Sequence, residues 1–311
     1  MTQTLRTLSG TPVSTLTFGT MQFGGAADEA ASRAMYDAAR AAGVTHFDTA
    51  VGYTDGASET LTGIFARPER EEVFLATKVA FDGGAGRANI RAQFDTSRRQ
   101  LGIDWVDLLY IHRWDGDTPS EETFSTLAEM QDQGLIRHIG VSNYAAWQVM
   151  KAQSIARTLG TRIDAIQPMY SLVKRQAEVE IFPMAQDQGI SVHAYSPLGG
   201  GLLTGKYARG EVGRLTESEM YRQRYDTDWM RRAAQALTDL AAELGTHPAT
   251  LAVAWTAAHP AQPSPIISAR SVAQLAPSLA AQGYAMTPDL YARLSALGPA
   301  PPPATDRLEE A

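Results

Sequence analysis

Four polar residues whose side chains could carry acid–base chemistry stand at or near the ends of short apolar runs. Asp48, Lys78 and His112 each end such a run, and Tyr53 follows Asp48 by five residues. A phenol with a pKa of about 10 is a weak proton donor at neutral pH, but a nearby ammonium stabilises the phenolate and lowers that pKa. We therefore predict that Lys78 tunes Tyr53 as a general acid and that Asp48 keeps Lys78 charged. His112 is expected to orient a bound carbonyl group and to stabilise the alkoxide that develops.

Each of the four residues has a simpler interpretation when it is taken alone. Lys78 would be a solvated charge, and His112 a satisfied histidine at the rim of a sheet. Asp48 would cap a helix, and Tyr53 would only cover the mouth of a barrel. Their joint occurrence favours chemistry, because a buried lysine without an acid beside it is costly. Such a site protonates an oxygen while another group attacks carbon. With no cysteine and no convincing Ser–His–acid arrangement in the chain, a cofactor that carries hydride is the natural partner.

Repeated strand and helix units must position these residues. Short runs rich in Val, Ile, Leu and Phe alternate with longer Ala-rich stretches whose apolar residues have helical spacing. The predicted strands are Leu16–Gly19, His46–Asp48, Val73–Lys78, Val106–His112, Ile136–Ser142, Ile163–Pro168, Ile190–Tyr195 and Pro265–Ile267. Glycines suited to left-handed helix caps close the helical stretches at Gly43, Gly102, Gly134, Gly160, Gly189 and Gly245.

The spacing of these caps favours a closed barrel. The caps from Gly102 to Gly189 recur about every 30 residues, the length of one strand–helix unit. Alternating strands and helices pair in parallel through right-handed crossovers, and eight such units close into a (β/α)8 TIM barrel of the α/β class. An open doubly wound sheet is the alternative, but residues 19–25 lack the G-x-G-x-x-G pattern expected after its first strand. In a barrel the four polar residues share the rim at the carboxyl ends of the strands.

Three further segments complete the predicted organisation. Leu5–Val13 reads as an N-terminal β-hairpin around a Ser-Gly turn, placed at the bottom of the barrel. Residues 198–228 form a long loop after the seventh strand, too irregular for an ordinary connection and therefore expected to be functional. Residues 298–311, which include three consecutive prolines, are expected to be a mobile tail. We predict one domain over residues 1–311.

The composition limits the possible partners. The chain has 311 residues, with 27 Lys and Arg against 34 Asp and Glu, and a net charge of −7. We do not expect nucleic acid as a partner, because binding phosphate backbones requires clustered basic residues, which this sequence lacks. The first residues lack an apolar signal region, and no stretch approaches 18 uninterrupted apolar residues. We expect a cytoplasmic protein that acts on a small molecule and does not bind a membrane.

Three motifs resemble those of a known family. Asp48-Thr49-Ala50-x-x-Tyr53, Ala76-Thr77-Lys78 and residues 109–114 (Leu-Tyr-Ile-His-Arg-Trp) look like the catalytic tetrad motifs of the aldo-keto reductases. The resemblance runs from about residue 5 to residue 281. Residues 142–147, 200–207 and 220–225 look most like the aflatoxin-aldehyde reductase branch. The family implies NADP(H)-dependent reduction of aldehydes or ketones, with Asp48, Tyr53, Lys78 and His112 as catalytic residues. It also implies a monomer or a homodimer.

The same resemblance implies a cofactor site. Ser142, Asn143 and Gln167 would hold the nicotinamide carboxamide, and the ring would stack on Tyr195. Ser268 and Arg270 would meet the 2′-phosphate, since arginine suits a phosphate dianion. This favours NADPH over NADH. The remaining residues implied at the cofactor are Gly19, Thr20, Met21, Ser196, Pro197, Leu198, Gly200, Gly201, Leu202, Lys206, Gln274 and Ser278. The last of these stands where the family has asparagine.

Two other motifs have competing interpretations. Residues 200–206 satisfy G-x-x-x-x-G-K, but Tyr207 stands where a nucleotide triphosphatase needs Ser or Thr for magnesium. The family resemblance instead assigns these glycines to a pyrophosphate. His46-x-Asp48 could belong to a metal site, but such a site needs a third and a fourth ligand. His138 and His193 stand before the ends of their predicted strands, and we expect no metal.

The substrate side is less constrained. Trp114, Tyr170 and Tyr221 could line an apolar pocket, although aromatic residues in barrel loops are as often part of the packing. Arg222 or Arg224 could clamp a carboxylate, as in a semialdehyde, with solvated loop arginines as the simpler interpretation. A second function is a nicotinamide-binding regulatory subunit that resembles the potassium-channel β subunits. Those proteins depart at the position of His112, and its presence here favours catalysis.

Overall fold

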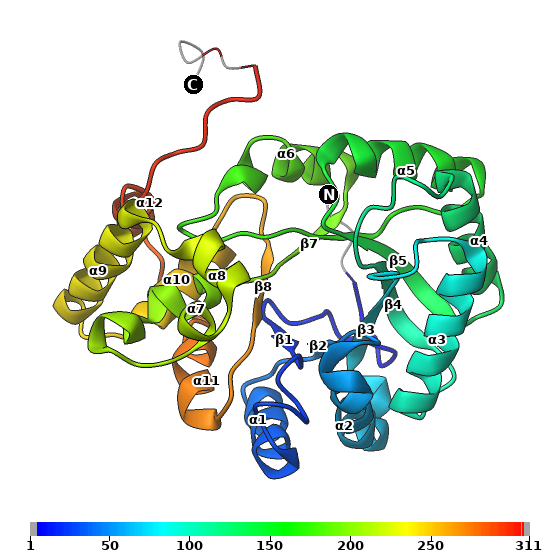
Figure 1. Cartoon of the computed structure of the whole chain (residues 1–311), viewed down its shortest axis with the longest axis horizontal. Helices are drawn as coiled ribbons and strands as arrows, with labels where there is room; N and C mark the ends of the chain where they lie inside the picture. Colours follow the sequence, from blue (N-terminus) through cyan, green and yellow to red (C-terminus); the bar gives the residue numbers. More distant parts are fainter. Residues whose placement is uncertain (1–4, 306, 308–311) are drawn as a thin grey trace.

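Eight parallel strands close into a barrel in their sequence order, with β1 paired to both β2 and β8 (Figure 1). The computed structural model describes residues 5–305 and residue 307. The strands are β1 (Thr17–Gly19), β2 (His46–Asp48), β3 (Phe74–Val79), β4 (Val106–Ile111), β5 (Ile136–Ser142), β6 (Ala165–Gln167), β7 (Ser191–Ala194) and β8 (Ser264–Ile267). All eight match predicted strands within about two residues at either end, so the predicted (β/α)8 barrel is confirmed.

Helices surround the barrel and connect successive strands. Six of them follow the first six strands: α1 (Glu29–Ala41), α2 (Ala57–Ala66), α3 (Arg87–Leu101), α4 (Ser120–Asp132), α5 (Ala146–Thr158) and α6 (Ile181–Gln188). The others are α9 (Asp228–Glu243), α10 (Pro248–Ala257), α11 (Val272–Leu279) and α12 (Pro288–Ser295). Helix α3 ends at Gly102 and α6 at Gly189, each with a positive φ, +64° and +62°. Glycine adopts this left-handed conformation without a Cβ clash, which turns the chain toward the next strand.

The predicted N-terminal hairpin is present as a short antiparallel turn. Arg6 and Pro12 form one antiparallel bridge rather than extended strands. Leu5 is buried in a cluster with Phe74 and Tyr110, whose side chains point into the barrel. An apolar side chain from outside the barrel therefore closes its interior at the amino-terminal ends of the strands.

The segment after β7 is long, as predicted, but it is largely helical. It contains η4 (Gly199–Thr204), η5 (Lys206–Arg209), α7 (Arg214–Glu217) and α8 (Glu219–Tyr225), where η marks a 3-10 helix. After α12 the chain continues as an extended segment without helix or strand (Figure 1). Gly298 still packs against Trp229, while residues 306 and 308–311 of the predicted tail lie outside the described residues. None of the helices in the described part is long and apolar enough to cross a membrane.

Candidate active site

A buried ion pair forms the base of the site at the carboxyl ends of β2 and β3. Lys78 is 0% exposed, and its ammonium contacts the carboxylate of Asp48. The same Nζ donates to the Thr49 carbonyl oxygen at 2.7 Å and to the Tyr53 hydroxyl at 3.4 Å. The register of β2 and β3 pairs Asp48 with Ala76, so two parallel strands bring the acid and the amine together. The structure thus joins three of the four predicted catalytic residues by direct contacts.

His112 follows β4 and completes the group. Its ring meets the ring of Tyr53 edge to face, with centroids 5.9 Å apart. Its backbone nitrogen donates to the Val79 carbonyl oxygen at 2.8 Å, which fixes it beside β3. Burial, with help from Lys78 and Arg113, lowers the pKa of His112 to about 3. The imidazole is therefore neutral at physiological pH, and one of its nitrogens carries a proton that it can donate in a hydrogen bond.

The charge balance at Tyr53 differs in part from the prediction. Burial raises the pKa of Tyr53 above its usual value, and the Asp48 carboxylate adds to this effect, whereas the Lys78 ammonium lowers it. The predicted influence of Lys78 has the expected direction, but burial outweighs it. At Lys78, burial lowers the pKa, and the opposing effects of Asp48 and Tyr53 are larger, so the pKa is raised. Lys78 is thus a permanent cation, and Tyr53 keeps its proton at neutral pH.

A left-handed turn follows Tyr53. Thr54 and Asp55 have φ of +49° and +52°, and Gly56 follows with a φ of +90°. Residues with a Cβ adopt this conformation at a cost of about 1–2 kcal/mol each, so surrounding contacts must hold the turn. The sequence did not reveal it, because only its third residue is a glycine.

The predicted nicotinamide residues lie together beside the ion pair. Gln167, at the end of β6, donates through Nε2 to Oδ2 of Asp48 at 2.9 Å. Asn143, which follows β5, donates to the His112 carbonyl oxygen at 2.9 Å. The Tyr195 hydroxyl in turn donates to Oδ1 of Asn143 at 2.7 Å. Residues at the ends of five strands, β2, β4, β5, β6 and β7, are therefore connected by hydrogen bonds in one small area.

The residues predicted to bind the phosphates lie on the segment after β7, which carries Lys206, and just after β8, where Ser268 and Arg270 stand. Ser268 Oγ is buried and has no hydrogen-bond partner among the described residues. Arg270 donates to Glu217 at 3.0 Å. Burial lowers the pKa of Lys206, and the positive charge of Arg270 contributes to the same shift. Two cations and an unpaired hydroxyl are a suitable donor set for a phosphate group.

The other predicted cofactor residues divide between the surface and the interior. Gly200 and Gly201 have φ of +66° and +94° in η4, and Gly201 lies close to the Lys206 side chain. Residues that are wholly or partly exposed to solvent are Met21, Ser196 and Leu198, with Gln274 accepting a hydrogen bond from the Arg270 backbone nitrogen. Those buried in the fold are Gly19, Thr20, Pro197, Leu202 and Ser278.

Comparison with known proteins decides the family. A model of the aldo/keto reductase family matches residues 15–298. The chain belongs to the aldo/keto reductase family. It is 35% identical to the "uncharacterized oxidoreductase YrpG" of Bacillus subtilis, over 94% of both chains. It is 32% identical to a probable voltage-gated potassium channel subunit beta of Oryza sativa, over 96% of this chain and 97% of the relative. It is also 36% identical to human aflatoxin B1 aldehyde reductase member 2, over 67% of this chain and 62% of the relative. The predicted family is confirmed, and relatives from the predicted branch are among the matches.

Aromatic side chains surround the mouth of the site in this aldo/keto reductase. Trp114 meets Tyr144 and Trp147 edge to face at 5.2 and 5.6 Å. Phe81, which sequence reasoning missed, is 49% exposed and meets the His112 ring at 5.0 Å. Its position three residues after Lys78, in the loop that leaves β3, was a usable signal.

Tyr170 lies elsewhere. It is 0% exposed, donates to Glu178 at 2.6 Å and stacks on Trp255 at 5.2 Å. Its ring is therefore part of the core and does not line an open pocket.

The two loop arginines of α8 have different surroundings. Arg222 is exposed and pairs with Glu219 at 3.2 Å. Arg224 lies 5.8 Å from the ring centroid of Tyr221 and has no acidic partner among the described residues. Burial lowers the pKa of Lys174, and the positive charge of Arg224 lowers it further. Burial raises the pKa of Tyr195, and the charge of Arg224 opposes that rise. Of the two predicted carboxylate contacts, Arg224 acts on Tyr195 and has no acidic partner among the described residues, whereas Arg222 is paired with Glu219.

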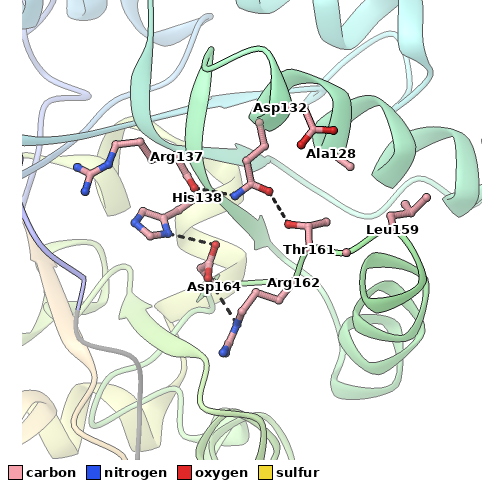
Figure 2. A pocket seen from close by; sticks show the side chains of 10 residues that line it. Ala128, Asp132, Arg137, His138, Leu159, Thr161, Arg162 and Asp164 are labelled. Carbon is pink, nitrogen blue, oxygen red and sulfur yellow. Dashed lines mark hydrogen bonds and ion pairs between the residues drawn. The ribbon is translucent and has the colours of Figure 1, made fainter.

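A polar hollow of about 510 Å³ lies at the opposite end of the barrel, beside the starts of β5 and β6 (Figure 2). His138 pairs with Asp164 at 3.2 Å, and Arg162 Nε lies 3.5 Å from the same carboxylate. His138 and Arg162 therefore share one carboxylate, at the end of the barrel away from the four predicted catalytic residues. Across residues 5–305 and 307, no three His, Asp or Glu side chains converge to hold a metal ion.

Proposed function

We propose that the protein reduces aldehydes or ketones to alcohols with NADPH. The observation that carries this proposal is the contact of a buried, charged Lys78 with the Tyr53 hydroxyl, beside a neutral His112. A cation within reach of a phenol favours loss of the phenolic proton at the moment when a carbonyl oxygen needs one. Because His112 is neutral, it is a hydrogen-bond donor rather than the acid.

The residues present fit the proposed cofactor. The unpartnered Ser268 hydroxyl and the positive charges of Lys206 and Arg270 suit its phosphates. The residues that would hold the nicotinamide end are Ser142, Asn143, Gln167 and Tyr195. When bound, the cofactor supplies a hydride for the carbonyl carbon.

The chain's own residues then handle the oxygen. The substrate carbonyl accepts a hydrogen bond from the imidazole of His112, which directs the oxygen toward Tyr53. Tyr53 donates its proton to that oxygen as negative charge develops there. Lys78 stabilises the resulting phenolate, and Asp48 keeps the ammonium in place.

The second candidate is a nicotinamide-binding regulatory subunit. It is supported by the 32% identity to the Oryza sativa channel subunit over almost the whole chain. The neutral imidazole beside Tyr53 favours catalysis, because a sensor that only binds nicotinamide does not need a donor at that place. A regulatory subunit would bind NADPH and show almost no loss of NADPH absorbance with a panel of aldehydes.

Replacing Tyr53 with Phe tests the catalytic proposal directly. Tyr53→Phe removes the hydroxyl and leaves the ring, so turnover of small aldehydes should fall by at least ~100-fold while NADPH binding is retained. The measurements are steady-state NADPH oxidation and quenching of protein fluorescence by NADPH. Tyr284→Phe, on the loop after α11, is the matched control. A fully active Tyr53→Phe enzyme would refute the role of Tyr53.

For the substrate we propose an aldehyde with a carboxylate, held by Arg224. Arg224→Ala should raise KM for carboxylated aldehydes by roughly 10-fold or more and leave KM for uncharged aldehydes nearly unchanged, since a charge-assisted hydrogen bond is lost. Arg222→Ala removes the same charge from the same helix and is the control. An unchanged KM for the carboxylated substrate in Arg224→Ala would exclude this contact.

A further inference from the structure

A buried carboxyl group beside the site has no part in the proposed proton transfer. Glu59, on α2, is 0% exposed, and among the described residues no Lys or Arg forms an ion pair with it. Its Oε1 accepts from the hydroxyl of Thr77 at 2.5 Å. Burial raises the pKa of Glu59 to about 7, against the smaller opposing effects of Thr77, Ser97 and Lys78. A carboxyl group buried at such a cost calls for a specific role.

The other carboxyl oxygen of Glu59 leads to the segment that carries Tyr53. It faces the side-chain amide of Gln100, on α3. With its nitrogen turned toward these acceptors, Gln100 donates both to Oε2 of Glu59 and to the carbonyl oxygen of Val51 at 3.2 Å. Val51 precedes Tyr53 by two residues, and its own nitrogen donates to the Lys78 carbonyl oxygen at 3.2 Å. A chain of polar groups therefore connects the buried Glu59 on α2, through Gln100 on α3, to the backbone beside Tyr53.

The left-handed turn after Tyr53 is held from two sides. On one side it packs on Gln100, since a Cβ at Gly56 would lie only 2.2 Å from the end of the side-chain amide of that residue. On the other side the Thr54 hydroxyl lies 2.8 Å from the Phe23 carbonyl oxygen and accepts from the Ser58 nitrogen at 2.9 Å. A conformation that residues with a Cβ seldom adopt persists only where its surroundings fix it.

We propose that Glu59 and Gln100 are positioning residues that act through Val51 and the left-handed turn to aim the Tyr53 hydroxyl at Lys78. This inference rests on the proposed role of Tyr53 as the acid. Glu59 fixes the Gln100 amide, and the amide fixes the backbone on which the phenol is mounted. Neither residue touches the substrate.

The aim of the hydroxyl matters because its contact with the ammonium is at the long end of the hydrogen-bond range, at 3.4 Å. A small displacement of Tyr53 weakens the effect of Lys78, so the pKa of the phenol rises and proton transfer slows. The charged or titratable groups that face Tyr53 are Lys78, Asp48, His112 and Tyr221. Of these, only Lys78 lowers the pKa of Tyr53.

The test compares variants of the full chain. Gln100→Met should lower kcat by about 10- to 100-fold while KM for the aldehyde and Kd for NADPH stay within about two-fold. The alkaline limb of the kcat–pH profile should move to higher pH, a change that a merely structural role does not produce. Gln153→Met is the matched control, because this buried glutamine on α5 accepts from the Ile163 backbone nitrogen at 2.7 Å and lies far along the chain from Tyr53. The control should lose comparable thermal stability and keep its kcat.

Two further changes keep the test decisive. Glu59→Gln retains an acceptor for Gln100 and should stay near wild type, whereas Glu59→Leu should behave like Gln100→Met. If the α2–α3 variants do not fold, Thr54→Val removes the second hold on the turn and should show the same loss of kcat and the same shift of the pH profile. A wild-type kcat in folded Gln100→Met would overturn the inference. If Gln100→Met does not fold, a wild-type kcat in Thr54→Val would overturn it.

Tyr53→Phe, measured in the same assay, separates this inference from the proposed function. An inactive Tyr53→Phe leaves the proposed function intact even if the inference is wrong, whereas an active Tyr53→Phe contradicts the proposed function itself.

Discussion

At the scale of single residues, Lys78 and Asp48 depend on each other for stability and differ in what they do for the reaction. Lys78→Met leaves the Asp48 carboxylate buried, with the Gln167 amide as its one remaining side-chain partner among the described residues. Loss of one member of a buried ion pair costs about 3–5 kcal/mol of unfolding free energy. We also expect kcat to fall by roughly 100- to 10,000-fold, because the pKa of Tyr53 rises when the ammonium is removed. Urea unfolding and steady-state kinetics measure the two effects separately.

A double variant separates stability from catalysis at the same pair. Lys78→Met combined with Asp48→Asn removes the unpaired charge, so part of the lost unfolding free energy should return. Turnover should stay as low as in the single variant, since no cation remains near Tyr53. Recovery of kcat together with stability would mean that Lys78 acts only in folding.

At the scale of the elements, β2 and β7 place two histidines inside the barrel below the tetrad. His46 and His193 meet edge to face at 4.6 Å, and Thr17 lies 3.0 Å from Nδ1 of His46. Burial lowers the pKa of His46 well below its usual value, and lowers that of His193 to about 4. The unfolded chain takes up protons as the pH falls below about 6.5, whereas the native barrel does not until lower pH. The free energy of unfolding should therefore fall on acidification.

The size of this effect follows from His193. Between about pH 7 and pH 5 its lowered pKa should remove about 2 kcal/mol of stability, and His46 adds to the loss. His193→Gln has no titrating ring, so its loss between the two pH values should be smaller by that amount in urea unfolding. An equal loss in both proteins would place the acid sensitivity elsewhere.

The strands and their ends were predictable, and the contacts between elements were not. Apolar runs such as Val106–His112 identified strands because a barrel strand is covered on both faces and reads as continuously apolar. The tetrad was predictable because parallel strands place their carboxyl ends on one rim. Glu59 and Gln100 were missed because each is an ordinary polar residue on its own helix, and their partnership exists only where α2 packs on α3. Tyr170 could not be placed, because an aromatic residue has the same signature in a core and in a pocket wall.

At the scale of the whole molecule, a net charge of −7 surrounds a site proposed to bind an anion. Arg270 is held by Glu217, which lies on α7 in the long segment after β7. This pair therefore connects the proposed 2′-phosphate site to the segment predicted to cover the cofactor. Both side chains are partly exposed, 37% and 49%, so the pair contributes less than about 1 kcal/mol. A phosphate that binds Arg270 must displace Glu217 or share the guanidinium with it.

Glu217→Gln should accordingly strengthen NADPH binding by up to about five-fold, because the phosphate no longer competes with a carboxylate. NADH lacks the 2′-phosphate, so its Kd should change little. Glu219→Gln is the control for overall charge, because it removes the same unit of charge from the pair that Glu219 forms with Arg222 at 3.2 Å. This variant should leave the ratio of the two Kd values unchanged. Fluorescence titration of both cofactors at low and at physiological ionic strength measures that ratio, and the gain should shrink as salt screens the exposed pair. Equal Kd values for NADPH and NADH in the wild-type protein would contradict the proposed contact between Arg270 and the 2′-phosphate. In that case the phosphate would not compete with Glu217 for the guanidinium.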